Sequence, residues 1–322
     1  MNEIKSYKIY ALSETLSPLT HMMGVSGNES IINREKVLYN GQLHDIPAIS
    51  GNALRHSLVR EPGAMLLCKL TGMYGNLTID QANFLFYGGS LTDSSTTENL
   101  KRIASMQTLM PLMRLLGGSL RNQVVSGALL VGRGALVCEE NRDTLAKLLP
   151  ESLRPDSSTL RSYEDFVSNW QYTRGDASRK PDVLAETEEA PEKSNLMIYA
   201  GQHVIPGALF AHTFILQNIT RLELGALFAS FEEWRDSGSA IGGSSRIGHG
   251  QINTAFTIGE PSGDFYGQEL NPQALAAEYR QHTIDNSAEI AEWLNSAFPE
   301  KKPAKKTSKK AEELQDAFWD GV

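Results

Sequence analysis

The chain has 322 residues and a hydrophobic content of 41%, which suits a soluble globular protein with one large domain or two smaller ones. No apolar run approaches the roughly 20 residues that span a bilayer, and the first residues lead directly into a strand-like run without a signal peptide. The two cysteines, Cys68 and Cys138, are too few for a disulfide framework and lack a metal-ligand spacing. We therefore expect a cytoplasmic protein with no membrane partner.

The charge of the chain is distributed unevenly. A formal net charge of −8 argues against a simple nucleic-acid-binding protein, which is usually basic over its binding domain. Residues 101–180, however, hold twelve basic against eight acidic side chains, whereas residues 259–298 hold seven acidic side chains and one arginine. The chain can therefore keep a basic groove while its other faces are acidic.

The first predicted elements are a strand and a hairpin. Residues 7–12 alternate polar and apolar and indicate a strand. A glycine- and asparagine-rich loop follows, and Asn40-Gly41 is a strong signal for the turn of a short hairpin. A helix is predicted to begin at Ser50, where a capping residue belongs.

Helical runs then dominate residues 61–119 and predict an insertion between elements of a sheet. The clearest runs are 79–87 and 100–116, and Pro111 is expected to kink or divide the second. The remaining predictions are a strand at 128–137, an irregular piece at 155–166, a polar stretch at 170–195, strands at 196–198 and 209–216, a helix at 222–234, a strand at 252–258, a helix at 272–294, and a Lys-rich linker before a short amphipathic end.

The order strand, helix, insertion, strand, strand, helix, strand fits a ferredoxin-like β-α-β-β-α-β core that carries insertions. Periodicity alone predicts the α+β class.

The segment 240–251, AIGGSSRIGHGQ, holds the strongest functional signal of the chain. It places four glycines, two hydroxyls and Arg246 in a short turn between a predicted helix and a predicted strand. Successive exposed amides in such turns form anion-binding concavities, and glycines let another backbone approach closely. The segment therefore indicates a place for a phosphodiester backbone.

A second segment, 46–60, has the sequence IPAISGNALRHSLVR and predicts a helix start with a free serine hydroxyl beside Arg55 and Arg60. A helix N-terminus of this kind is a ready anion site. Two such sites could hold one extended nucleic-acid strand between them. Helix capping alone would equally explain Ser50, Gly51 and Asn52.

Together the two segments resemble motifs of the RAMP superfamily of CRISPR-associated proteins, over roughly residues 5 to 258. In that family a helix start with proline, serine and arginine follows the first strand, and a glycine-rich loop comes late in the chain. Within the superfamily the chain looks like the repeated backbone subunit that coats guide RNA. The segment 17–29 and the two motifs look most like the type IV version, and the type I-D backbone subunit is a near relative.

The resemblance implies a fold with a palm, fingers and a thumb. The implied parts are an RRM-like palm at 5–60, 120–165 and 196–258, a helical finger insertion at 61–119, a thumb-like β-hairpin at 166–195, and a C-terminal helix with a Lys-rich tail at 259–322.

The resemblance also implies a function: a non-catalytic subunit that oligomerises along CRISPR RNA (crRNA) and presents the guide for base pairing with a target. Resemblance to the type IV version implies that this target is DNA. The implied partners are crRNA, target nucleic acid, copies of the chain itself, a large or small effector subunit, a RAMP subunit that binds the guide end, and a helicase. The residues expected to bind RNA are Arg34, Lys36, Ser50, Gly51, Asn52, Arg55, Arg60, Arg114, Arg121, Arg174, Arg179, Lys180, Gly243, Ser244, Ser245, Arg246 and His249.

Each of these sites has a plainer explanation. The loop at 240–251 can be a turn-rich connection, and His249 can be a hydrogen-bonded structural residue. The arginines can be solvated surface charges, and the basic run at 174–180 can be a solvated loop. The C-terminal lysines can form a solvated tail or add affinity for RNA.

No catalytic residues, metal ligands or cofactor are expected. Type III relatives cut RNA with an aspartate after the first strand, and residues 27–36 contain none. Three alternatives remain: a type III-like ribonuclease that uses Glu29 or Glu35, an enzyme that binds a small phosphorylated ligand at the 241–250 loop, and a purely structural oligomer.

Overall fold

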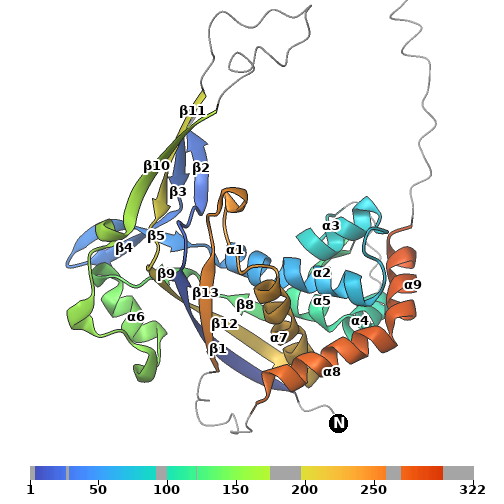
Figure 1. Ribbon diagram of the computed structural model, residues 1–322. Coiled ribbons are helices and arrows are strands. Elements are labelled where there is room, and N and C mark those ends of the chain that lie inside the picture. Colours follow the sequence, from blue (N-terminus) through green and yellow to red (C-terminus); the bar gives the residue numbers. More distant parts are fainter. Residues whose placement is uncertain are drawn as a thin grey trace, which may run out of the picture.

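The computed structural model describes residues 4–26, 29–91, 100–120, 122–174, 197–258 and 270–299 (Figure 1). It has a mixed α+β fold built on antiparallel sheets, which confirms the predicted class. The strands are β1 (Lys5–Thr15), β2 (Met22–Ser26), β3 (Glu29–Ile32), β4 (Arg34–Tyr39), β5 (Gln42–Ile49), β6 (Gly118–Leu120), β7 (Gln123–Val125), β8 (Leu129–Val131), β9 (Gly134–Leu136), β10 (Val167–Arg174), β11 (Met197–Val204), β12 (Leu209–Ile219) and β13 (Ile252–Ile258). The helices are α1 (Gly51–Arg55), the π-helical turn η1 (His56–Arg60), α2 (Glu61–Leu70), α3 (Ile79–Tyr87), α4 (Leu100–Leu109), α5 (Pro111–Leu116), α6 (Arg142–Leu148), α7 (Arg221–Asp236), α8 (Pro272–Asp285) and α9 (Ser287–Ala297), with short 3-10 turns between them.

The larger sheet has the order β13-β1-β12-β9-β5-β4, with β8 beside β12. Strand β1 lies between β12 and β13 and runs antiparallel to both. The elements β1, α1–α2, β8–β9, β12, α7 and β13 follow the β-α-β-β-α-β order that the sequence predicts. This sheet is therefore the frame that positions the two sequence motifs.

Helix α7 covers one face of this sheet. Leu224, Leu227, Phe228 and Phe231, the predicted apolar face, are all buried. The ring of Phe231 stacks on Phe256 of β13 with centroids 4.1 Å apart. Burial of aromatic side chains of this size is a main source of core stability.

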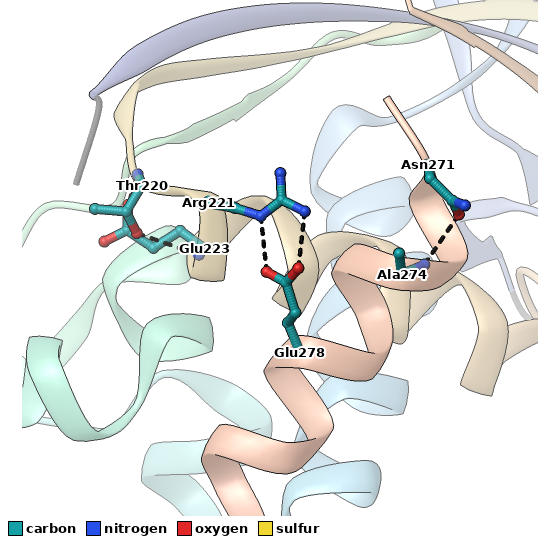
Figure 2. Close-up of polar contacts among 6 residues, drawn as sticks. All are labelled: Thr220, Arg221, Glu223, Asn271, Ala274 and Glu278. Atoms are coloured by element: carbon teal, nitrogen blue, oxygen red, sulfur yellow. Dashed lines mark hydrogen bonds and ion pairs between the residues drawn. The ribbon is translucent and has the colours of Figure 1, made fainter. Parts of the chain in front are cut away.

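An ion pair joins the first turn of α7 to α8, and each of the two helices is capped at its start (Figure 2). Thr220 and Glu223 form a capping box, and Asn271 caps α8 by accepting a hydrogen bond from the amide of Ala274 at 3.0 Å. Arg221 donates two hydrogen bonds to the carboxylate of Glu278, at 2.7 and 2.8 Å. The helices fix each other's position at the end of the sheet.

Helices α2–α5 form a second core together with α9. Phe84 of α3 lies against Trp293 of α9 and against Phe298, with ring centroids 6.0 and 5.0 Å apart. The single helix predicted at 272–294 is wrong, because the chain turns at Asn286, whose side chain donates to the carbonyl of His282 at 2.7 Å. The turn sends α8 onto α7 and α9 onto the helical unit.

A second sheet, in the order β10-β11-β3-β2, projects from the main body (Figure 1). Strands β10 and β11 pair from Val167↔Val204 to Arg174↔Met197. Residues 197–204, which form β11, therefore belong to this second sheet. Strands β2 and β3 form at the start of residues 23–45, where the sequence predicts a glycine- and asparagine-rich loop that leads to the hairpin.

Several local predictions are confirmed. Asn40 and Gly41 have φ of 50° and 78°, as the predicted turn requires, and Pro111 divides α4 from α5. The strand expected at 128–137 is instead two short strands, because it breaks at Gly132 and Arg133. None of the helices in the described ranges is both long and apolar enough to cross a membrane. The Lys-rich tail and residues 175–196, which hold most of the predicted polar stretch, lie outside the described residues.

Candidate nucleic-acid interface

Residues 18–21, just after β1, join the two sequence motifs. The amides of Gly243 and Gly250 each donate a hydrogen bond to this segment, at 2.8 Å to the carbonyls of Thr20 and Pro18. The amide of Ser50, where α1 begins, donates to Nε2 of His21 at 3.2 Å. The fold thus brings the glycine-rich loop and the helix start to either side of one short segment.

The same segment meets the base of the β10–β11 hairpin. Leu19 and Val204 exchange two backbone hydrogen bonds, of 2.8 and 2.9 Å. Three regions that are far apart in the sequence therefore meet at residues 18–21: the glycine-rich loop, the start of α1, and the hairpin.

The start of α1 is capped as predicted. The Ser50 hydroxyl accepts a hydrogen bond from the amide of Ala53 at 3.2 Å. Close packing explains the glycine at position 51, because a Cβ there would lie 2.4 Å from the carbonyl oxygen of Val131. Asn52 is exposed on the next position. Capping and close packing account for Ser50 and Gly51, and Asn52 is the residue that this turn presents outward.

The glycine-rich loop needs its left-handed positions. Gly242 and Gly250 have φ of 82° and 84°, and a Cβ at either would lie within 2.7 Å of a backbone carbonyl. Ser244 also has a positive φ, of 62°, and residues 245–247 form a 3-10 turn. Such alternation turns successive amides toward one side.

The amides of Ser244, Ser245 and Arg246 meet no acceptor in the described part of the chain. The Arg246 side chain is exposed and forms no ion pair with any described residue. Three open donors and one open guanidinium therefore lie on consecutive residues, and groups of this kind can bind an oxyanion.

His249 connects this loop to the hairpin. Its Nδ1 is hydrogen-bonded to the hydroxyl of Thr20 at 2.8 Å. Its ring lies edge-on to Trp170 at 6.2 Å and is 6.1 Å from the ring of His203. Burial lowers the pKa of His249 and of His203, and the charge of His249 lowers the pKa of His203 further, so both rings tend to be neutral at pH 7.

Arg55 and Arg60 turn away from the loop toward the helical unit. The Arg60 side chain is 6% exposed and donates to the carbonyls of Leu85, Leu116 and Gly117 at 3.0 to 3.4 Å. Arg55 donates to the carbonyl of Leu116 as well. Burial and the charge of Arg55 lower the pKa of Arg60 to about 10.

Both arginines line a cavity of about 510 Å³, together with Asn52, His56 and Tyr87. Its lining contains no carboxylate. The cavity gives Arg55 access to solvent, whereas the hydrogen bonds of Arg60 give that residue a structural role.

The other predicted residues are dispersed. Arg34 donates to the carbonyl of Asp45 at 3.0 Å and to the Gln202 side chain at 3.1 Å, and Lys36 pairs with the Asp45 carboxylate at 3.2 Å. Arg114 lines a separate cavity of about 440 Å³ beside α4, and Arg174 is exposed at the end of β10. Arg121, Arg179 and Lys180 lie outside the described residues.

Sequence reasoning missed the residues that hold the site together. Thr20 and His21 connect the motifs through hydrogen bonds that no local pattern encodes. It also missed Trp170, Tyr172 and Tyr199, whose rings stack in sequence along the hairpin. Aromatic residues two positions apart in a strand lie on one face, so the spacing of Trp170 and Tyr172 was an available signal.

No model of a known protein family matches the chain, and no curated protein matches it. A chain of a solved type IV-B CRISPR complex is similar in structure, with a TM-score of 0.54 and 20% sequence identity, over 82% of this chain and 95% of that one. This chain has the fold of a CRISPR-complex protein. The resemblance that the two motifs indicate is thus confirmed at the level of the fold. Csc2 from Thermofilum pendens also aligns, with a TM-score of 0.39 and 16% identity over 91% of this chain and 80% of that one.

Proposed function

We propose that this chain is a non-catalytic, guide-RNA-binding backbone subunit of a type IV CRISPR effector complex. The observation that carries the proposal is that residues 18–21 hold the glycine-rich loop and the start of α1 on either side, and that the amides of residues 244–246 and the Arg246 side chain meet no acceptor among the described residues. The fold shared with a chain of a type IV-B CRISPR complex supports it.

The site would act by binding the sugar-phosphate backbone. Amides and a guanidinium contact phosphate oxygens equally well in any sequence, so they leave the bases free. The guide would then be read by base pairing with a target strand. In this proposal the seven-stranded sheet is the palm, α2–α5 are the fingers, and the β10–β11 hairpin is the thumb.

The interface we propose is narrower than the sequence alone predicts. It centres on Gly243, Ser244, Ser245 and Arg246, with Asn52 on the adjacent turn. Arg60 and Lys36 have other partners, and we leave them out. Arg55, Arg114 and Arg174 remain candidates for longer stretches of RNA.

Assembly belongs to the same proposal. Copies of the chain would associate head to tail along crRNA, which is a heterologous contact that extends until something caps it. Other effector subunits would bind the ends of this filament. A DNA target and a helicase partner follow only from the type IV resemblance.

The structure gives less support to a ribonuclease. The Glu35 carboxylate, one of its two candidate metal ligands, is ion-paired with Arg133. Among the residues that the structure describes, no three His, Cys, Asp or Glu side chains are grouped to hold a metal ion.

An enzyme for a small phosphorylated ligand is also less well supported. The cavity of about 350 Å³ beside the loop is lined by Glu61, Met65 and Trp234 among others. A carboxylate in the lining repels a phosphate, so this cavity does not suit such a ligand.

Purification from the native host tests the proposed function. We expect a large particle that is rich in RNA by its absorbance ratio at 260 and 280 nm, and sequencing should show repeat-spacer RNA of uniform length. A monomer free of nucleic acid would overturn the proposal.

Arg246→Ala tests the phosphate contact directly. Affinity for RNA should fall by a similar factor for unrelated sequences, and the slope of log K against log salt should flatten by about 0.7, the contribution of one phosphate contact to a single strand. Arg154→Ala, at another exposed arginine remote in the chain, is the matched control. A change in sequence preference with an unchanged salt slope would contradict a backbone contact.

A further inference from the structure

One face of the β10–β11 hairpin carries aromatic and basic side chains. Trp170, Tyr172 and Arg174 alternate along β10 and therefore share a face. Their neighbours across the ladder place Tyr199 on the same face, opposite Tyr172, and His203 opposite Ser168. We call Trp170, Tyr172, Tyr199, His203 and Arg174 the aromatic strip.

The rings of the strip are stacked. Trp170 and Tyr172 have centroids 5.5 Å apart with planes at 11°, and Tyr172 and Tyr199 have centroids 5.1 Å apart with planes at 16°. Gly201 lies opposite Trp170, and a Cβ there would come within 2.8 Å of the indole. The glycine therefore leaves room for the indole to lie across the neighbouring strand.

The strip is partly open to solvent and lacks acidic side chains. The Tyr172 side chain is 46% exposed, and Arg174 is exposed at the outer end. Glu29 of the adjoining strand β3 pairs with Ala200 and so lies on the opposite face. Among the described residues of this face there is no carboxylate, although the whole chain has a net charge of −8.

The strip is continuous with the glycine-rich loop. His249, which closes that loop, lies 6.2 Å from Trp170 and 6.1 Å from His203. A chain bound at the amides of residues 244–246 would therefore find aromatic rings beside it in the direction of the hairpin.

We propose that the aromatic strip is a stacking site for unpaired nucleobases of a single-stranded nucleic acid. The proposal rests on the proposed function, which places the phosphates of that strand at the glycine-rich loop. Grooves that combine positive charge with successive aromatic rings bind single strands without sequence preference, because every base has a face that can stack. Arg174 at the outer end supplies a further contact for a phosphate or a base.

Cross-strand pairing of aromatic residues also stabilises a hairpin on its own. The two roles differ in what they require of the ligand. If the rings only stabilise the hairpin, the bases of a nucleic acid add nothing to its affinity for the protein. If the rings form a stacking site, the bases increase that affinity.

The test compares two strands of equal length, one a fluorescein-labelled oligouridine and the other an abasic strand with the same backbone. The full chain should bind oligouridine about tenfold more tightly than the abasic strand. Tyr172→Leu should remove about that factor for oligouridine and leave binding of the abasic strand unchanged. Tyr172→Phe should keep wild-type affinity, and Tyr74→Leu, at a tyrosine 64% exposed elsewhere, is the matched control.

The outcomes separate the two proposals. If the abasic strand binds as tightly as oligouridine and Arg246→Ala weakens both, the phosphate site stands and the stacking site is overturned. If neither strand binds, both proposals fail. Thermal unfolding checks that Tyr172→Leu is folded. If the folded variant loses the same factor in affinity for oligouridine and for the abasic strand, the stacking site is also overturned.

Discussion

His212 is a single buried group that contributes to the response of this protein to pH. The side chain is fully buried in β12, and its Nε2 is hydrogen-bonded to the Ser13 hydroxyl at 2.9 Å, which in turn contacts Thr254 at 2.8 Å. Burial lowers the pKa of His212 from 6.5 to about 3. The imidazole is therefore neutral in the folded protein at all moderate pH values.

Stability should therefore fall on acidification below pH 6.5. The unfolded chain takes up a proton at His212 near pH 6.5, whereas the folded chain does not until about pH 3. The stability that His212 contributes is therefore fully present above pH 6.5 and is lost as the pH falls from 6.5 toward 3. The slope is at most about 1.4 kcal/mol per pH unit for this group. Urea unfolding at pH 7, 6 and 5 measures it, and His212→Gln should flatten the profile. An equally steep profile in that variant would assign the effect to other groups.

At the scale of elements, α7 depends on its first turn. The Thr220 hydroxyl accepts from the amide of Glu223 at 3.3 Å, and the Glu223 carboxylate accepts from the amide of Thr220 at 2.7 Å (Figure 2). The two contacts satisfy amides that the helix itself leaves open. Because α7 covers the sheet that positions the glycine-rich loop, this cap is a stability determinant of the whole site.

Thr220→Ala should lower the free energy of unfolding by about 1 kcal/mol, and Thr220→Ser should restore most of it. Arg221→Ala, which removes an exposed ion pair with Glu278, should cost less than about 1 kcal/mol. Chemical denaturation of the three variants gives the comparison. A larger loss from Arg221→Ala than from Thr220→Ala would show that the ion pair, rather than the cap, holds this turn.

Most elements could be predicted where the signal is local. The Asn40-Gly41 turn, the Ser50 cap, the division at Pro111 and the strand Ile252–Ile258 each depend on residues that are neighbours in the sequence. The break at Asn286 could not, because the apolar residues on both sides continue a helical spacing. The chain divides there because α8 packs against α7 and α9 packs against the helical unit. These are tertiary contacts, which a local sequence pattern does not contain.

The two motifs of the candidate site could be predicted from the sequence, and the contacts that join them could not. The glycine-rich loop shows itself through residue types that are needed for positive φ and open amides. The sequence alone predicts that Arg60 contacts RNA, and the structure shows its donors on three backbone carbonyls. An arginine looks the same in sequence whether its donors meet carbonyls or solvent. The hydrogen bonds of Thr20 and His21 span large separations along the chain, so no window of sequence contains them.

At the scale of the whole molecule, α9 completes the helical unit. Ile290, Trp293 and Leu294 are all buried against the core that contains Phe84 and Met106. Without α9 that core would present a large apolar surface to water. Helix α9 is therefore part of the folded body, packed into this core.

Trp293→Ala should lower the free energy of unfolding by about 3–5 kcal/mol, since it removes a large side chain that is 8% exposed. Ile284→Ala, at a side chain of α8 that is 46% exposed, is the control and should change stability little. Thermal unfolding of both variants measures this. Equal losses would mean that α9 contributes no more than a surface helix.

The position of β1 also bears on how the protein is made. This first strand pairs with β12 and β13, which end at Ile219 and Ile258, and in the described residues it has no earlier strand as a neighbour in the sheet. At a synthesis rate of about 5–20 residues per second, β1 waits on the order of ten seconds or more for its partners. The hydrogen-bonding edges of a nascent β1 are meanwhile open to other chains, so yield should depend on chaperones and on the speed of translation.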